Sequence, residues 1–255
     1  MFETRFREEL EAIGPFPQIP DVSPDQQRAA RHIDFPAWVA IFDALTSLDH
    51  VRGYRLPSFD QFLSACEDSY VTKYVGPRHG ESSKKSPNRF YRYFDRQSPL
   101  WSAVQSRLAG FYLSGIAEAH LYIALVDAIE DRSRCGIVLK DPRVDWKLKV
   151  DIAVIVPTEG SFHNFLISEY ANQDKDRGQI ESARLTVELQ RKARTLGSSQ
   201  IPLQPMLKSF HHIAVSLDKD KADVVGGVSI FSYPALNQIL EQIYVTAGIT
   251  GWLFP

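Results

Sequence analysis

The segment Val150 to Val156 most constrains the fold of this chain, because it is β-branched and apolar on both of its faces. Alternate side chains of a strand point to opposite faces, so such a strand belongs in the centre of a sheet that is covered on both sides. Pro157 to Gly160 predicts a turn, and Phe162 to Tyr170 predicts a returning strand. Two further apolar segments, Gly136 to Leu139 and His212 to Leu217, predict additional strands.

Apolar residues three and four positions apart predict helices on both sides of these strands. Ser58 is placed to cap one of them, and Pro36 and Pro234 stand where a proline fits the first helical turn. The predicted helices are Phe2 to Ile13, Asp25 to Ile33, Phe35 to Leu48, Phe59 to about Tyr74, Leu100 to Leu125 (one helix, or two broken near Ser114 and Gly115), Arg177 to Leu196 and Tyr233 to Val245.

These elements predict an α/β protein with a helical N-terminal region and a C-terminal mixed sheet flanked by helices. We place the helical region at 1–97, including a basic-aromatic loop, and the α/β core at 98–255. From Leu100 onward the predicted order is helix, strand, strand, strand, helix, strand, helix.

The composition of the chain limits the partners that it can bind and the cellular compartment in which we expect it. The net charge of −2 provides no overall positive charge to attract DNA or an anionic membrane, so any nucleic-acid contact requires a local basic patch. The two cysteines, Cys66 and Cys135, do not form a disulfide framework or a zinc motif. The N-terminus lacks an apolar signal region, and no run of about 18 apolar residues is present. We therefore expect a cytoplasmic protein without a membrane span.

A basic-aromatic segment, Lys73 to Arg96, contains seven Lys and Arg residues against only Glu81 and Asp95. Basic side chains neutralise phosphates and aromatic rings stack on bases, so this composition favours binding of single-stranded or distorted nucleic acid. The residues expected to bind are Lys84, Lys85, Arg89, Tyr91, Arg92 and Arg96. The alternatives are a solvated basic loop whose aromatic residues pack into the core, or a surface for an acidic protein partner.

The predicted order of elements resembles the α-β-β-β-α-β core of the restriction-endonuclease-like, or PD-(D/E)XK, superfamily. The resemblance covers roughly Leu100 to Val215. It implies that Asp151, at the start of the second strand in KLKVDIAVIV, and Glu169, near the end of the third in FLISEYA, hold a divalent metal and activate water. It also implies an acidic residue from the first helix, for which Glu118 is the candidate. Carboxylate oxygens suit Mg²⁺ or Mn²⁺.

The chain departs from the superfamily at the lysine that follows two residues after the third-strand acid, because Ala171 stands there. Lys149, Lys175 and Lys192 are possible substitutes. Lys149 shares a strand face with Asp151, and Lys192 lies on the helix predicted after the third strand. A purely structural interpretation of the acids is also open: Glu169 as a solvated strand end, and Asp151 as a carboxylate paired with Lys147 or Lys149.

Two functions follow from these patterns. One is a nucleic-acid-handling protein with metal-dependent phosphodiester hydrolysis, which the resemblance associates with bacterial defence or mobile-element systems. The other is a catalytically inactive α/β scaffold or binding subunit of a larger complex, since a fold does not imply an active site. Neither His211 and His212 nor the glycine pair Gly226 and Gly227 has the spacing of a zinc or nucleotide motif. The C-terminal Trp252 to Phe254 docks either on its own core or on another chain.

Overall fold

A computed structural model provides the structure of the 255-residue chain. The structure describes residues 1–14, 16, 21–30, 38–47, 53–70, 96–140, 150–170, 187, 188, 191, 209–218 and 220–255. These residues form two compact units. The sheet unit consists of Met1–Glu8 and Ile116–Pro255, and the helical unit consists of Glu9–Gly115. The division differs from the one expected near residue 97, because a single helix continues from one unit into the other.

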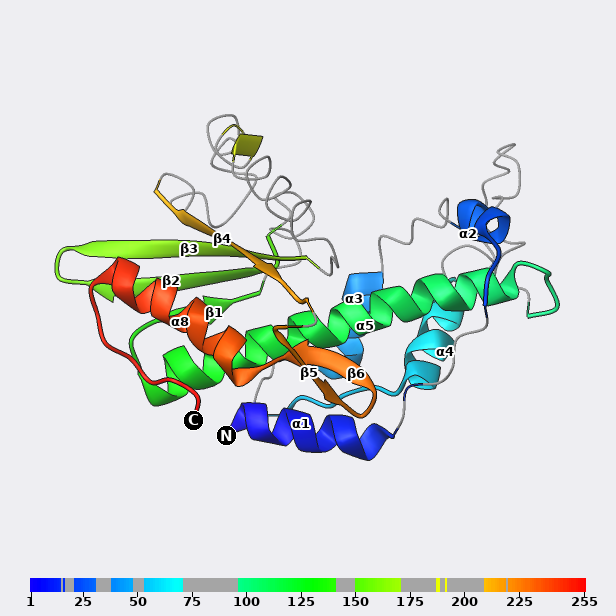
Figure 1. Cartoon of the computed structure of the whole chain (residues 1–255), viewed down its shortest axis with the longest axis horizontal. Helices are drawn as coiled ribbons and strands as arrows, with labels where there is room; N and C mark the ends of the chain where they lie inside the picture. Colours follow the sequence, from blue (N-terminus) through cyan, green and yellow to red (C-terminus); the bar gives the residue numbers. More distant parts are fainter. Residues whose placement is uncertain are drawn as a thin grey trace, which may run out of the picture. The chain divides into compact units, whose positions relative to one another are not determined.

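The sheet unit is built on four strands in the order β1-β2-β3-β4 (Figure 1). Strands β1 (Ile137–Leu139), β2 (Ile152–Thr158) and β3 (Ser161–Tyr170) form an antiparallel meander, and β4 (His211–Ser216) pairs with β3 in parallel. The sheet is therefore mixed, and the predicted α/β class with a helical N-terminal region is confirmed. The predicted helix Arg177 to Leu196 lies almost entirely outside the described residues.

Strand β2 is an inner strand, as its sequence predicts. Val154 and Val156 on one face, and Ala153 on the other, are almost completely buried. The hairpin to β3 is tighter than predicted, because Pro157 and Thr158 pair with Phe162 and Ser161 within the sheet. Only Glu159 and Gly160 form the turn, and Gly160 has a φ of 78°, which glycine adopts without strain.

A second, two-stranded sheet was missed by the sequence analysis. Strands β5 (Ala222–Val225) and β6 (Val228–Phe231) form an antiparallel hairpin around Gly226 and Gly227, whose φ angles are 57° and 80°. Two consecutive residues with positive φ form the tight turn that matches the twist of a hairpin, and glycine pairs favour it. The glycine pair therefore serves a turn.

Helix α5 (Trp101–Leu125) is one unbroken helix, and a π-helix, η4 (Val126–Arg132), continues it. Gly115 does not break the helix. A Cβ at this position would lie 3.0 Å from the Phe42 ring, so the glycine allows that ring to approach closely. By length and composition alone, Trp101–Arg132 is the one helix among the described residues that could cross a membrane, but 78% of its most apolar stretch is buried inside the protein. The absence of a membrane span stays a prediction.

The helical unit packs around the Tyr112 ring, which is contacted by Phe16, Phe42, Phe59 and Phe62. The Tyr112 hydroxyl donates a 2.7 Å hydrogen bond to the carbonyl oxygen of Pro57, which satisfies the polar end of a buried ring. The helices of this unit are the remainder of α1 (Phe2–Ile13), α2 (Pro24–Ala30), α3 (Trp38–Thr46), α4 (Phe59–Tyr70) and the first part of α5.

Helix α4 begins with the cap that the sequence predicts. The Ser58 hydroxyl accepts from the Gln61 amide at 3.2 Å, and the Gln61 side chain accepts from the Ser58 amide at 2.9 Å. Such a reciprocal pair provides acceptors for two backbone amides at the start of the helix that have no partner within the helix. The two residues therefore fix where the helix begins.

A buried polar network in the sheet unit joins α1 to much later parts of the chain. The Glu3 carboxylate is hydrogen-bonded to His120 Nε2 at 3.0 Å and accepts from the Tyr233 hydroxyl at 2.9 Å. Arg7 pairs with the same carboxylate and with Asp223 at 2.7 Å. Burial raises the pKa of Glu3, but hydrogen bonds from His120 and Arg7 outweigh burial and lower it below its usual value. Burial lowers the pKa of His120.

The C-terminal tail docks on its own unit, which is one of the two alternatives left open by the sequence. Asn237 of α8 (Tyr233–Ala247) brackets Phe254: its amide nitrogen donates to the Phe254 carbonyl at 2.9 Å, and its oxygen accepts from the Phe254 amide at 2.8 Å. The Trp252 amide donates to the Ser133 hydroxyl at 2.7 Å. Gly251 leaves no room for a side chain, since a Cβ there would lie 2.2 Å from the Tyr244 ring.

Replacing Asn237 with alanine tests how much this bracket stabilises the fold. Because Asn237→Ala removes both side-chain partners of the Phe254 backbone, we expect the free energy of unfolding to fall by about 1–3 kcal/mol. Urea denaturation followed by circular dichroism measures the change. The control is Gln238→Ala at the exposed neighbouring position of the same helix, which should change the free energy of unfolding by less than about 0.5 kcal/mol. Equal losses in both variants would contradict the role of the bracket.

Candidate functional site

The two strand acids predicted from the sequence lie side by side at one end of the sheet. Asp151 directly precedes β2, and its Oδ2 accepts a 2.6 Å hydrogen bond from the backbone amide of Glu169. The Asp151 amide in turn donates to the Ile167 carbonyl at 3.0 Å, so the pairing of the strands continues one residue beyond β2. The end of β3 and the start of β2 therefore hold Asp151 and Glu169 together.

The surroundings of Glu169 disfavour its charged form. Its Oε1 is buried and has no hydrogen-bond partner among the described residues. Burial, the charge of Asp151 and the charge of Glu118 together raise the pKa of Glu169 well above its usual value. A carboxyl that is removed from water and placed near two others favours its neutral form. The three predicted acids thus lie within electrostatic reach of one another.

Glu118 comes from the buried middle of α5 and forms an ion pair with Lys140. The Lys140 Nζ lies 2.7 Å from Glu118 Oε1, and the two side chains are only 9% and 8% exposed. Lysine and glutamate are rarely buried unless they are paired. The pair therefore brings a positive charge to the same group of carboxylates. We call the four residues of this group the carboxylate cluster: Glu118, Lys140, Asp151 and Glu169.

The sequence analysis missed Lys140, although strand topology contains a signal for it. Leu139 pairs with Ala153, and Ile152 pairs with Ile167. In an antiparallel meander the end of the first strand, the start of the second and the end of the third lie at the same end of the sheet. Lys140 directly follows β1, so it belongs at the end of the sheet that carries Asp151 and Glu169.

The cluster offers carboxylate oxygens, the ligands that Mg²⁺ and Mn²⁺ prefer. Across the described ranges, however, no three His, Cys, Asp or Glu side chains are grouped so that they could hold a metal ion as they stand. Mg²⁺ is commonly bound by one or two carboxylates, water and substrate phosphate. The Oε1 of Glu169 is buried and has no hydrogen-bond partner among the described residues, so it fits such a partial site better than a complete protein cage.

Most of the other predicted site residues lie outside the described residues. They are Lys84, Lys85, Arg89, Tyr91 and Arg92 of the basic-aromatic segment and the lysines Lys147, Lys149, Lys175 and Lys192. Arg96 is described, and it pairs with Glu67 at 2.7 Å. Its guanidinium also lies 5.8 Å from the centre of the Trp101 ring. The candidate cation contributed by the described residues is therefore Lys140.

The histidine pair before β4 has local partners. His212 Nε2 is hydrogen-bonded to the Ser168 hydroxyl at 3.1 Å, and burial lowers the pKa of His212. The His211 ring stacks on Phe165 and lies 6.0 Å from the ring of His163. These contacts connect β3 to β4 and include no ligand set for a metal in the described part of the chain.

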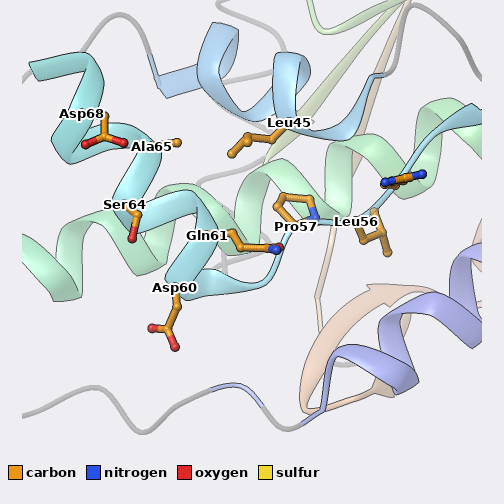
Figure 2. Close-up of a pocket in the computed structure, with 9 residues that line it drawn as sticks. Leu45, Leu56, Pro57, Asp60, Gln61, Ser64, Ala65 and Asp68 are labelled. Atoms are coloured by element: carbon orange, nitrogen blue, oxygen red, sulfur yellow. The ribbon is translucent and has the colours of Figure 1, made fainter. Parts of the chain in front are cut away.

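The helical unit carries an open hollow of about 600 Å³ (Figure 2). One face of α4 lines it with Asp60, Gln61, Ser64, Ala65 and Asp68, and its other lining residues are Leu45, Arg55, Leu56 and Pro57. Its lining includes no predicted site residue and no member of the carboxylate cluster. The hollow is therefore distinct from the candidate site.

Comparisons of the chain with protein-family models, with curated proteins and with solved structures find no match.

The raised pKa of Glu169 predicts a specific dependence of stability on pH. A carboxyl whose pKa is raised by folding stabilises the protein at low pH, and that contribution is lost as the pH rises from the ordinary value of 4.5 through the folded pKa. Glu169→Gln removes the ionisable group. The free energy of unfolding of the variant, relative to that of the wild type, should therefore be higher at pH 8 than at pH 4.5. Urea denaturation at both pH values, in EDTA, measures the difference.

The matched control for this test is Glu159→Gln in the exposed turn between β2 and β3. Its stability relative to the wild type should change little between the two pH values. If the free energies of unfolding of Glu169→Gln and the wild type differed by the same amount at pH 4.5 and at pH 8, folding would not raise the pKa of Glu169.

Proposed function

We propose that this chain is a nucleic-acid-handling protein that hydrolyses phosphodiester bonds at the carboxylate cluster with Mg²⁺ or Mn²⁺. Its core would be a variant of the PD-(D/E)XK arrangement in which the usual third-strand lysine is missing. The proposal includes the associated context of a cytoplasmic defence or mobile-element system.

One observation carries the proposal. The resemblance implies that Glu118, Asp151 and Glu169 form one site, and the charges of Glu118 and Asp151 both act on Glu169. Acidic side chains that serve only as solvated strand ends have no reason to converge at a buried point. Convergence with loss of solvation is typical of groups that bind a cation or transfer a proton.

Within this proposal, Asp151 and Glu169 would hold the cation at the end of the sheet. When bound, the metal would supply a nucleophilic water and offset charge on the phosphate. The described residues have two parts in this chemistry: Asp151 fixes the β3 backbone through the Glu169 amide, and Glu169 offers a buried oxygen without another partner.

The proposed nucleic-acid contact is the basic-aromatic segment. Its basic side chains would bind backbone phosphates and its rings would stack on bases. Arg96, at the end of this segment, is held by Glu67 and Trp101 in the helical unit. A protein partner with an acidic surface would use the same residues.

A second candidate function is favoured by the ion pair at Glu118. Because Lys140 already neutralises Glu118, and Ala171 replaces the usual lysine, the cluster is also consistent with a chain that has kept the fold and lost catalysis. Such a chain would act as a binding subunit of a larger nucleoprotein or protein complex.

A cleavage assay tests the proposed hydrolysis. Wild-type protein is incubated with single- and double-stranded DNA and RNA in Mg²⁺, in Mn²⁺ and in EDTA. We expect metal-dependent cutting that falls at least about 100-fold in Asp151→Asn and in Glu169→Gln, because each variant removes a carboxyl group that would hold the metal. The control Glu159→Gln should cut at the wild-type rate. Binding without cutting in any metal would support the scaffold, and equal cutting by all variants would place the activity elsewhere.

A salt titration tests the basic-aromatic segment independently of catalysis. We expect the triple variant Lys84→Ala/Lys85→Ala/Arg89→Ala to weaken binding of a single-stranded oligonucleotide in EDTA. The dependence of log K on log salt should become shallower by about 0.7 for each lost phosphate contact, or about 2 in all. The exposed Arg28→Ala in α2 serves as the control. A slope equal to that of the wild type would exclude these residues from the interface.

A further inference from the structure

The hollow in the helical unit lies along one face of α4 (Figure 2). Gln61, Ser64, Ala65 and Asp68 are spaced three and four residues apart, so they lie on the same side of the helix. Ser64 and Ala65, in the middle of this row, are too short to fill the space in front of Leu45 of α3. The row therefore leaves about 600 Å³ open at the surface of the unit.

The base of the hollow is apolar. Leu56 and Pro57 are buried there, and Leu45 and Ala65 are half-buried. An apolar surface at the bottom of an open depression favours a partner that can place apolar side chains on it. Because the hollow is open and not enclosed, it suits a segment of polypeptide better than a small molecule.

Two carboxylates border this apolar base. Asp60 and Asp68 are exposed, and neither has an ion-pair partner among the described residues. Asp68 lies in the last turn of α4, which also contains Glu67 and no basic residue. The C-terminal end of a helix carries a partial negative charge, so acidic side chains there are unfavourable and a nearby cation is stabilising. The hollow therefore attracts positive charge at the end that Asp68 forms.

One arginine of the chain already pairs with an acid of α4. The Arg96 guanidinium lies 2.7 Å from the Glu67 carboxylate. This hydrogen bond raises the pKa of Arg96, and the charges of Glu67 and Asp60 also raise it. Asp60 thus acts on Arg96 and also lines the hollow. The structure itself shows that the acids of α4 attract a guanidinium.

The charges around the hollow are not uniform. Arg55 is the one basic residue in its described lining, and it directly precedes Leu56. Leu56 and Asp68 lie at opposite ends of the hollow in Figure 2. An elongated ligand with positive charge therefore has a preferred direction, with its basic side chains toward Asp68.

We propose that the hollow is a docking site for a short basic segment of a partner protein. Apolar side chains of the segment lie on the base of the hollow, and its Lys or Arg side chains pair with Asp60 and Asp68. Nucleic acid does not fit, because both carboxylates repel its phosphates. The inference goes beyond the proposed hydrolysis and does not depend on the carboxylate cluster.

The test is the binding of a synthetic peptide to the full chain. A fluorescein-labelled peptide that repeats a pair of leucines and a pair of arginines is titrated with protein, and fluorescence anisotropy measures its Kd. We expect the wild type to bind it more tightly than a peptide in which glutamate replaces every arginine. Asp60→Asn/Asp68→Asn should weaken binding about 5- to 10-fold, because this double variant removes two exposed charges that pair with the arginines.

The control for overall charge is Glu11→Gln/Asp21→Asn. It removes the same charge at two exposed acids of the helical unit that do not line the hollow. This control should bind the basic peptide as the wild type does. If the control and Asp60→Asn/Asp68→Asn lose the same affinity, the peptide responds to the net charge of the protein, and the inference is wrong.

Ala65→Phe tests the apolar base separately, because it fills the hollow without changing any charge. It should weaken binding at least as much as the double charge variant. Ala44→Phe, at an exposed position of α3 outside the lining, is the matched control and should bind normally. Circular dichroism compares the folding of the variants. If Ala65→Phe does not fold, Ser64→Gln fills part of the same space with a residue that favours a helix.

The same variants identify any other occupant. A wild type that does not bind the basic peptide overturns the inference. A wild type that elutes as a dimer, and becomes monomeric as Ala65→Phe, assigns the hollow to a second copy of the chain. Weaker binding of a single-stranded oligonucleotide by Ala65→Phe assigns it to nucleic acid. Each of these results excludes a basic protein segment, whereas cleavage of nucleic acid by the wild type bears only on the proposed hydrolysis.

Discussion

A carboxylate that is taken out of water requires a partner, and this constraint organises the sheet unit. Glu3 meets His120, Arg7 and Tyr233; Glu118 meets Lys140; and Asp151 accepts the amide of Glu169. Except for the pair of Glu3 and Arg7 within α1, each of these contacts joins different elements of the chain. The buried Oε1 of Glu169, in contrast, has no hydrogen-bond partner within the described residues. The charges of two other carboxylates act on Glu169, and for that reason it is the centre of the candidate site.

Much of the fold could be predicted because it follows from local patterns. The apolar character of Val150 to Val156 predicted an inner strand, and the three-to-four spacing of apolar residues predicted α1, α5 and α8 close to their observed bounds. The hairpin β5–β6 was missed for a physical reason. Its strands are only four residues long, too short for an alternation of apolar and polar residues to be recognised, and β5 is largely half-exposed. The glycine pair between them was the available signal.

The site was predictable only in part. Its acids were predicted from the resemblance to the PD-(D/E)XK core, and the hairpin between β2 and β3 explains why Asp151 and Glu169 lie at the same end of the sheet. Lys140 was missed because it follows the first strand, whereas the predicted substitute lysines lie near the second and third strands or on the helix after them. The meander brings the end of the first strand to the same end of the sheet as Asp151 and Glu169. Ion pairing between Glu118 and Lys140 depends on how α5 packs on the sheet, and residue spacing along the chain does not encode that packing.

The placement of Glu3 has a consequence for the order in which the chain folds during synthesis. Glu9–Gly115 is a continuous segment, so all residues of the helical unit have left the ribosome before most of the sheet unit has been made. Glu3 is translated almost at once, but its hydroxyl donor, Tyr233, follows 230 residues later. Until then the first turns of α1 lack the partners that bury them. The sheet unit can therefore bury the first turns of α1 only after Tyr233 has been made.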